Sequence, residues 1–273
     1  MAYQLLALDM DGTLLTSHKT VSARTREALR ALAAQGTPIA YCSGRCFREL
    51  LDYPTELPFI RYGVLASGAV VYDFDARRTL ALHPLDVQVV EQAMAIADAE
   101  EHMTHVMSAE FSVVRPQDID QMERFGMGVY QGMFRQICET PDDLAPWVRD
   151  HAGEVVKVNF YHRDAAARDR TRARLAESGL PLTLANAEET SVECSPLGMS
   201  KAKGLQTLAS YVGCTLQDVV AIGDSDNDLA ALEAVGMPVA MGNATEAIRR
   251  VAHLVVADND HDGIVEAIDR LFG

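Results

Sequence analysis

The sequence predicts an α/β fold in which a parallel sheet carries helices on both faces and an α+β unit is inserted near its middle. Short apolar runs alternate with helical patterns at both ends of the 273-residue chain, as in parallel sheets covered on both faces. The central part, about residues 84–194, instead combines helices with hairpin-like runs. We therefore expect a discontinuous core, residues 1–83 and 195–273, and an inserted domain, residues 84–194.

The first elements follow from local signals. Residues 5–8 are all apolar, which suits a short strand buried on both faces. Ser22 is suited to cap the following helix and Gly36 to end it. Further core strands are expected at 38–42, 62–66, 70–72, 219–222, 238–241 and 254–256, and helices at 201–211, 226–235, from 245, and up to 271. In the insert we expect helices at 87–99 and 165–177, strands at 103–107, 111–115 and 155–161, and a loop at 125–134.

The net charge of 24 − 39 = −15 narrows the range of partners. An acidic surface repels nucleic-acid phosphates and anionic lipids, so neither nucleic acid nor membrane is an expected partner. No apolar run approaches the ~18 residues that span a bilayer. The first residues lack a basic leader, so we expect a cytoplasmic protein. The sequence predicts no oligomeric state.

The strongest motif follows the first strand. Asp9 and Asp11 lie two residues apart, so an extended backbone points both carboxylates the same way. Gly12 then permits a turn that other residues resist. Ligands bind at this carboxyl end of strands in open parallel sheets. Two adjacent carboxylates would raise each other's pKa unless a cation neutralises them, which predicts a functional site here.

A second acidic motif follows the strand at 219–222. Asp224, Asp226 and Asp228 fall within five residues, directly before an apolar helix. Such oxygen-rich segments suit a hard cation, and the spacing is not that of a calcium-binding EF-hand loop. The favourable interaction of acids with a helix N-terminus accounts for Asp226 and Asp228 but leaves Asp224 unexplained.

Two weaker elements accompany the acidic motifs. Ser43 and Gly44 follow the second core strand and offer a hydroxyl and a backbone amide for a phosphate group. Lys201 begins a helix, where a cation opposes the helix dipole, so this unusual placement needs a partner. A lone lysine is usually solvated at the surface, and only the accompanying motifs make Lys201 a candidate site residue.

Taken in order, these motifs resemble those of the haloacid dehalogenase-like superfamily. They are Asp-Met-Asp-Gly-Thr at 9–13, Ser-Gly-Arg at 43–45, Lys201, and Gly-Asp-Ser-Asp-Asn-Asp at 223–228. The segment 240–244 and the position of the insert resemble the Cof-type sugar-phosphatase branch. The resemblance implies a Rossmann-like core with a cap domain, and a Mg²⁺-dependent phosphoric monoester hydrolase acting on a small phosphorylated metabolite, with a sugar phosphate as the first expectation.

The resemblance also implies roles for individual residues. Asp9 would attack phosphorus to form an aspartyl phosphate, and Asp11 would act as acid and then as base. Mg²⁺ would be held by Asp9, the backbone carbonyl of Asp11, and Asp224, with Asp228 orienting these ligands. The phosphoryl oxygens would be held by Ser43, Lys201, Asn227 and the backbone amides of Met10 and Gly44.

The sequence departs from the family pattern at two positions and leaves the substrate open. Ser67 stands where asparagine is common, and Ala231 where methionine is frequent. Substrate contacts could come from Arg45, Lys157 or the expected loop at 125–134, but ordinary structural roles suit each of them equally well.

Two other functions remain open at this stage. A phosphomutase of the same superfamily also forms an aspartyl phosphate but returns the phosphoryl group to a sugar. A non-enzymatic, Mg²⁺-dependent phospho-receiver would use the aspartate alone. The presence of both Asp11 and Lys201 argues against the receiver, and a receiver needs no substrate cap.

Overall fold

The computed structural model describes residues 3–186 and 189–273, and these fall into two compact units. The first comprises the chain up to Gly44 together with Asp52–Ala81 and Ser200–Gly273. The second comprises Arg45–Leu51 and Leu82–Met199. The division into a core, residues 1–83 and 195–273, and an inserted cap domain, residues 84–194, remains a prediction. Within the described ranges, no helix is both long and apolar enough to cross a membrane.

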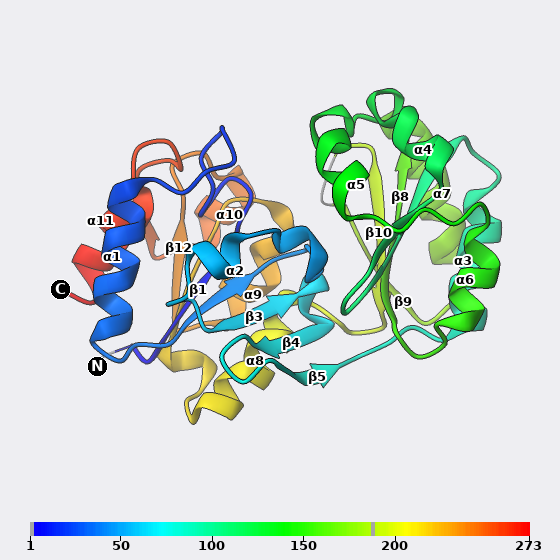
Figure 1. The fold of residues 1–273 in the computed structure, drawn as a ribbon. Coiled ribbons are helices and arrows are strands. Elements are labelled where there is room, and N and C mark those ends of the chain that lie inside the picture. The colour runs from blue at the N-terminus through cyan, green and yellow to red at the C-terminus, as the bar shows by residue number, and fades with distance from the viewer. Residues whose placement is uncertain (1–2, 187–188) are drawn as a thin grey trace. The chain divides into compact units, whose positions relative to one another are not determined.

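The first unit is built on a sheet of eight strands (Figure 1). Its central strands run parallel, which confirms the predicted α/β core, and β4 is antiparallel to β3. The strand at Arg78–Leu82 was not predicted from the sequence. The strands, in order across the sheet, are β13 (Leu254–Val255), β12 (Met237–Ala240), β11 (Val219–Gly223), β1 (Leu5–Leu8), β2 (Ile39–Cys42), β3 (Tyr62–Leu65), β4 (Val70–Asp73) and β5 (Arg78–Leu82).

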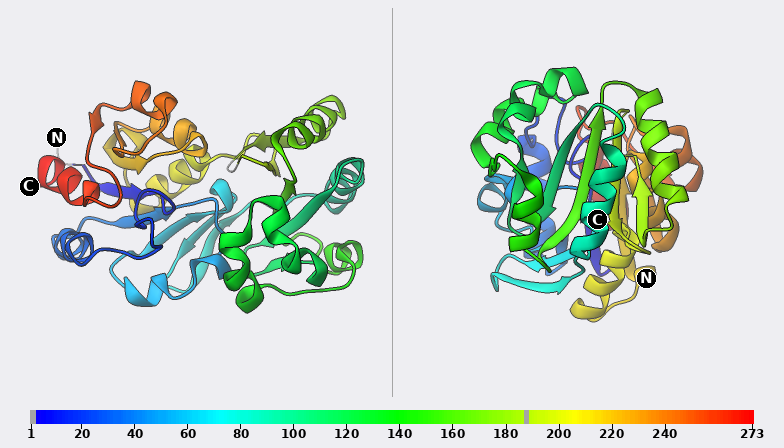
Figure 2. Two further views of the ribbon diagram at one scale, coloured as in Figure 1. Left: turned by 90° about the horizontal axis from the view of Figure 1, so that it is seen from above. Right: turned by 90° about the vertical axis from the view of Figure 1, so that its right-hand side faces the viewer.

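Helices cover both faces of this sheet (Figure 2). Helices α1 and α11 pack together on one face, whereas α8, α9 and α10 pack on the other over an apolar cluster that includes Leu5, Leu205 and Ala231. Ala231 is buried in that cluster, so its departure from the family pattern lies in the packing of the core. The helices are α1 (Ala23–Ala34), α2 (Tyr53–Glu56), α8 (Lys201–Val212), α9 (Leu229–Ala234), α10 (Glu246–Val251) and α11 (Gly263–Leu271).

The strand register sets the location of the site. Strand β1 pairs in parallel with β11 and β2, so that Leu8 lies beside Ile222 and Tyr41. All three strands are completely buried, as their apolar sequences predict. Their carboxyl ends therefore lie at one edge of the sheet, and the predicted motifs begin there.

The second unit is an antiparallel sheet with an apolar core on each face. Helices α3, α6 and α7 pack on one face, against Phe160 and its neighbours. Residues of α4 and α5 pack on the other, with Met103 and Tyr161. The strand order is β7 (Ser112–Val114), β6 (His102–Ser108), β8 (Val155–His162), β10 (Ser191–Pro196) and β9 (Leu182–Ala185), and the helices are α3 (Val87–Ala97), α4 (Pro116–Asp120), α5 (Gln131–Ile137), α6 (Leu144–Asp150) and α7 (Ala165–Glu177).

The prediction of a loop at residues 125–134 is wrong. Short 3₁₀ turns end at Phe125 and span Gly128–Tyr130, and helix α5 begins at Gln131. Phe125 and Phe134 are buried in the apolar cluster on this face of the second sheet. The glycines and methionines of this segment give it a weak helix propensity, so its sequence suggested a loop. Burial of the two aromatic rings outweighs that weak propensity and stabilises the helical turns.

Helix α8 approaches the loop after β3 so closely that only glycine fits. A Cβ atom at Gly204 would lie 2.5 Å from Val64 Cγ1 and 2.8 Å from the Cα of Gly68. Gly68 itself has a φ of +100°, and a side chain there would collide with the carbonyl oxygen of Ser200, the N-cap of α8. These contacts fix the start of α8 and hence the position of Lys201.

Gly204→Ala should lower the free energy of unfolding by about 1–3 kcal/mol, because the added methyl group overpacks this contact. Helix propensity alone predicts that the substitution raises the free energy of unfolding, since alanine is favoured over glycine in a helix by about 1 kcal/mol. Urea denaturation measures the difference. Gln206→Ala, an exposed change on the same helix, is the control and should be neutral or slightly stabilising. Equal stability of the Gly204→Ala protein and the wild type would contradict the close approach.

Candidate active site

Asp9 lies directly after β1 and is 5% exposed. A tight turn follows it, in which Met10 O accepts hydrogen bonds from Thr13 N and Leu15 N. Gly12 adopts a φ of +83° in this turn, and a Cβ atom there would collide with the carboxylate of Asp224. The glycine predicted for the turn thus has a second role, since its missing side chain admits the second acidic motif.

The acidic motif after β11 is ordered by its own side chains. Asp228 Oδ2 accepts hydrogen bonds from Asp224 N at 3.0 Å and from Ser225 N at 3.2 Å, as part of a capping box with Ser225. Asp224 Oδ1 accepts from the Thr13 hydroxyl at 2.8 Å. The backbone oxygen of Asp224 accepts from Thr245 N at 2.9 Å. Hydrogen bonds therefore fix both the backbone and the side chain of Asp224.

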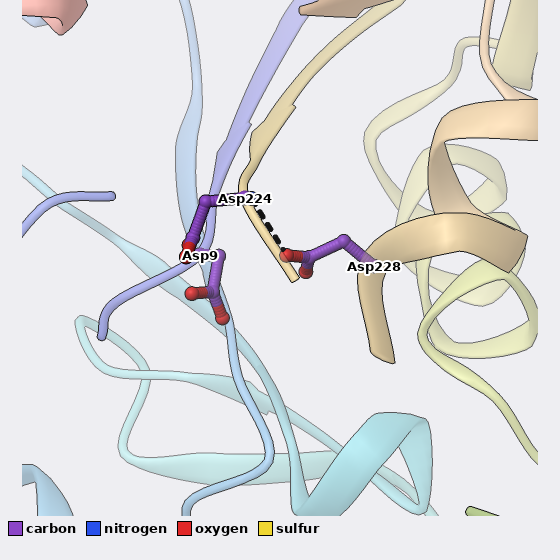
Figure 3. Close-up of side chains that lie close together, drawn as sticks. All are labelled: Asp9, Asp224 and Asp228. Carbon is purple, nitrogen blue, oxygen red and sulfur yellow. Dashed lines mark hydrogen bonds between the residues drawn. The ribbon is translucent and has the colours of Figure 1, made fainter. Parts of the chain in front are cut away.

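The two motifs meet at one group of carboxylates. Asp9, Asp224 and Asp228 each offer an oxygen, and these three atoms lie within 4.8 Å of one another (Figure 3). Lys201 Nζ reaches the same group and lies 2.7 Å from Asp9 Oδ1 and 2.6 Å from Asp228 Oδ1. The partner that the placement of Lys201 called for is this pair of aspartates, 192 and 27 residues away along the chain.

The three carboxylates and the ammonium of Lys201 form a largely buried group in which acidic side chains outnumber basic ones. Burial and the neighbouring Asp228 raise the pKa of Asp9 well above its usual value, against the lowering effect of Lys201. Burial also raises the pKa of Asp224 to about 6. Burial lowers the pKa of Lys201, but Asp228 and Asp9 outweigh it and hold that pKa well above its usual value. One ammonium does not balance three carboxylates, so the arrangement suits a further cation.

The other predicted site residues lie around this group or beside it. Asn227 Oδ1 accepts from Lys201 Nζ at 3.1 Å, and Ser43 is buried directly after β2. The side chain of Asp11 instead points to a different partner, because its Oδ1 accepts from Lys19 Nζ at 2.6 Å. Met10 is completely buried, and Gly44 follows Ser43 at the same strand end.

The residues considered for substrate contacts have structural partners in the second unit. Arg45 donates to the backbone oxygen of Glu49 at 2.8 Å. Lys157 is 1% exposed and pairs with Glu193 at 2.7 Å. The structural roles weighed for these residues are thus observed, whereas contacts with a substrate remain a prediction.

Sequence reasoning assigned no role to three residues that contact the site. They are Thr13, which donates to Asp224; Asn243, whose side chain donates to Gly12 O at 2.8 Å; and Lys19, the partner of Asp11. The first two lie inside motifs, so their positions were a usable signal. Lys19 lies in no motif, and its sequence context resembles any solvated lysine.

Comparison with known proteins identifies the family of this chain. The model of the haloacid dehalogenase-like hydrolases matches residues 6–268. The chain belongs to this family. A haloacid dehalogenase-like relative from Bacillus subtilis, named as a 5-amino-6-(5-phospho-D-ribitylamino)uracil phosphatase, is 30% identical over 276 residues, which cover 98% of this chain and 97% of the relative. The pyridoxal phosphate phosphatase of Escherichia coli is 27% identical over 274 residues, 98% of each chain.

Solved structures of the haloacid dehalogenase-like family agree with this fold. One from Bacteroides thetaiotaomicron has a TM-score of 0.85 at 26% identity and covers 99% of this chain and 100% of its own. Another from B. subtilis has a TM-score of 0.87 at 24% identity, with 98% and 99% covered. The predicted family, fold and enzyme class, a phosphoric monoester hydrolase, are therefore confirmed.

Proposed function

We propose that this chain is a Mg²⁺-dependent phosphatase that hydrolyses a small phosphorylated metabolite through an aspartyl phosphate on Asp9. The observation that carries the proposal is the convergence of Asp9, Asp224 and Asp228 around the buried ammonium of Lys201. Haloacid dehalogenase-like membership supports it, as do relatives that are named as phosphatases.

The donor set fits Mg²⁺, a hard cation that prefers carboxylate and carbonyl oxygens. Both oxygens of Asp228 already accept hydrogen bonds, from Lys201 and from backbone amides. We therefore assign the ligands to Asp9, Asp224 and the backbone carbonyl of Asp11, and an orienting role to Asp228. When bound, the cation neutralises negative charge on these acids and on the phosphoryl group.

The chemistry assigned to the chain's own residues proceeds in two steps. The carboxylate of Asp9, fixed by Lys201 at Oδ1, attacks phosphorus, while the ester P–O bond breaks and Asp11 gives a proton to the departing oxygen. Asp11 then takes a proton from water, the water oxygen attacks phosphorus, and the bond to Asp9 breaks. The products are inorganic phosphate and the alcohol, and both aspartates return to their starting state.

Phosphoryl transfer depends mainly on positioned positive charge and hydrogen-bond donors. We assign the phosphoryl oxygens to Ser43, Lys201 and Asn227, together with the backbone amides of Met10 and Gly44. Ser43 and Lys201 are buried at the same sheet edge as Asp9.

We propose a small phosphorylated metabolite as the substrate, with sugar phosphates considered first. The relatives are named as phosphatases of 5-amino-6-(5-phospho-D-ribitylamino)uracil and of pyridoxal phosphate, so these two compounds belong on the same panel. The charge of −15 disfavours nucleic-acid and membrane partners, and we place the enzyme in the cytoplasm. A panel assay scored by released phosphate identifies the substrate, and release without a bisphosphate activator separates a phosphatase from a phosphomutase.

Asp9→Asn should reduce kcat by at least about 10³-fold, because the amide is a poor nucleophile. The measurement is phosphate release from p-nitrophenyl phosphate, with circular dichroism as a check on the fold. Substantial residual turnover in a folded variant would refute the assignment of the nucleophile.

Excess EDTA should abolish turnover, and added Mg²⁺ should restore it. Mg²⁺ should also raise the melting temperature of the wild type, since a ligand that binds only the folded state stabilises it. Asp224→Asn should lose most of that thermal shift. Asp226→Asn, an exposed acid of the same motif, is the matched control and should keep it. Full activity in EDTA would rule out the metal.

Asp11→Asn should lower kcat by about 10²–10⁴-fold for esters with poor leaving groups, because general acid catalysis contributes about that much. The loss should be smaller for p-nitrophenyl phosphate, whose leaving group scarcely needs a proton. Rates with phenyl phosphate and p-nitrophenyl phosphate provide the comparison. Equal losses for the two esters would count against the acid role.

A further inference from the structure

Lys19 contacts the side chain of Asp11 with its ammonium, although nothing in the motifs pointed to it. Its Nζ lies 2.6 Å from Asp11 Oδ1, and both residues belong to the first unit. The pair is partly exposed, with 45% of the lysine side chain and 33% of the aspartate side chain accessible.

The loop that carries Lys19 is fixed at several points. Lys19 N donates to Thr16 O at 2.9 Å, and Thr16 N donates to Thr20 O at 2.8 Å, which closes a tight turn. The hydroxyl of Tyr53 donates to the backbone oxygen of Lys19 at 2.7 Å, and Ser17 N donates to Asp260 Oδ1 at 2.9 Å. The lysine is thus anchored at its backbone, and its side chain extends from a defined place.

Lys19 has a backbone conformation that lysine rarely adopts. Its φ of +57° lies in the left-handed region, where a side chain is disfavoured and glycine is not. Partly exposed ion pairs contribute little to folding stability. Stability therefore does not account for a lysine at this position, whereas its contact with a proposed acid and base does.

We propose that Lys19 is a positioning residue for Asp11. Its ammonium holds Oδ1 of the carboxylate and so restricts rotation of the side chain, and the proton passes to the departing oxygen from Oδ2. This inference rests on the proposed function, since it deepens the role given to Asp11. It accounts for a cation beside an acid that is not part of the three-carboxylate group.

The test compares two aryl esters of similar size, phenyl phosphate and p-nitrophenyl phosphate, in the full-length protein with Mg²⁺. Lys19→Met should lower kcat for phenyl phosphate by about 10- to 100-fold, because small misplacements of a catalytic group cost up to ~10²-fold. The kcat for p-nitrophenyl phosphate should change less than about threefold, and KM for both esters should stay near wild type. Lys19→Arg keeps the cation and should recover most of the lost rate.

Two further variants make the result specific. Lys203→Met removes an exposed positive charge from the same unit, so it reports any general loss of attraction for anionic substrates, and it should affect neither ester. Lys19→Gly suits the positive φ and removes the amine, so it should reproduce the Lys19→Met pattern even if the methionine disturbs the loop.

Equal losses for both esters, no loss, or an effect on KM alone would overturn the positioning role. The same holds if Lys203→Met matches Lys19→Met. Asp11→Asn in the same assay separates the two proposals. If it discriminates between the esters and Lys19→Met does not, only the role of Lys19 fails. If Asp11→Asn does not discriminate either, the acid role of Asp11 fails as well.

Discussion

The position of the acidic motifs in the first unit depends on the buried ion pairs that Lys201 makes with Asp9 and Asp228. The ammonium joins Asp9 after β1 to Asp228 after β11, and it enters from the first residue of α8. Removing one partner of a buried ion pair typically costs about 3–5 kcal/mol, since the remaining charge stays without compensation. Three elements that are distant in sequence are therefore positioned together, and the approach of α8 at Gly204 is as much a requirement of the site as the acids are.

Much of this site could be predicted because parallel strands place their carboxyl ends at one edge. The apolar runs at 5–8 and 219–222 located β1 and β11 as strands of a sheet covered on both faces, and the structure pairs Leu8 with Ile222. Asp9 and Asp224 then had to lie close together. The helix predicted at 165–177 has the same bounds in the structure, where it is longer than three turns and is capped by Asp164.

What sequence reasoning missed depends on tertiary contacts rather than local pattern. The helix beginning at Gln131 is short and weak in propensity, and burial of Phe134 determines it. The sequence left a structural role and a substrate contact both open for Lys157, and no local pattern indicated its buried pair with Glu193 on the neighbouring strand. Lys19 lies eight residues after Asp11 and contacts it because the turn that contains Lys19 brings the chain back toward the first motif. No periodic sequence pattern indicates that turn.

The two aspartates of the first motif are two residues apart but have opposite surroundings. Asp9, the proposed nucleophile, is buried against Lys201, so its position is fixed. Asp11, the proposed acid and base, is partly exposed and meets a lysine that is itself nearly half exposed, so solvent can reach this carboxylate as the proposed role requires. The turn at Gly12 separates these environments, because it lets the chain leave the sheet edge immediately after Asp11 while Asp224 occupies the space beside it. Two identical side chains thereby have different surroundings, which suit the two roles proposed for them, and the difference lies in burial and in the lysine that each contacts.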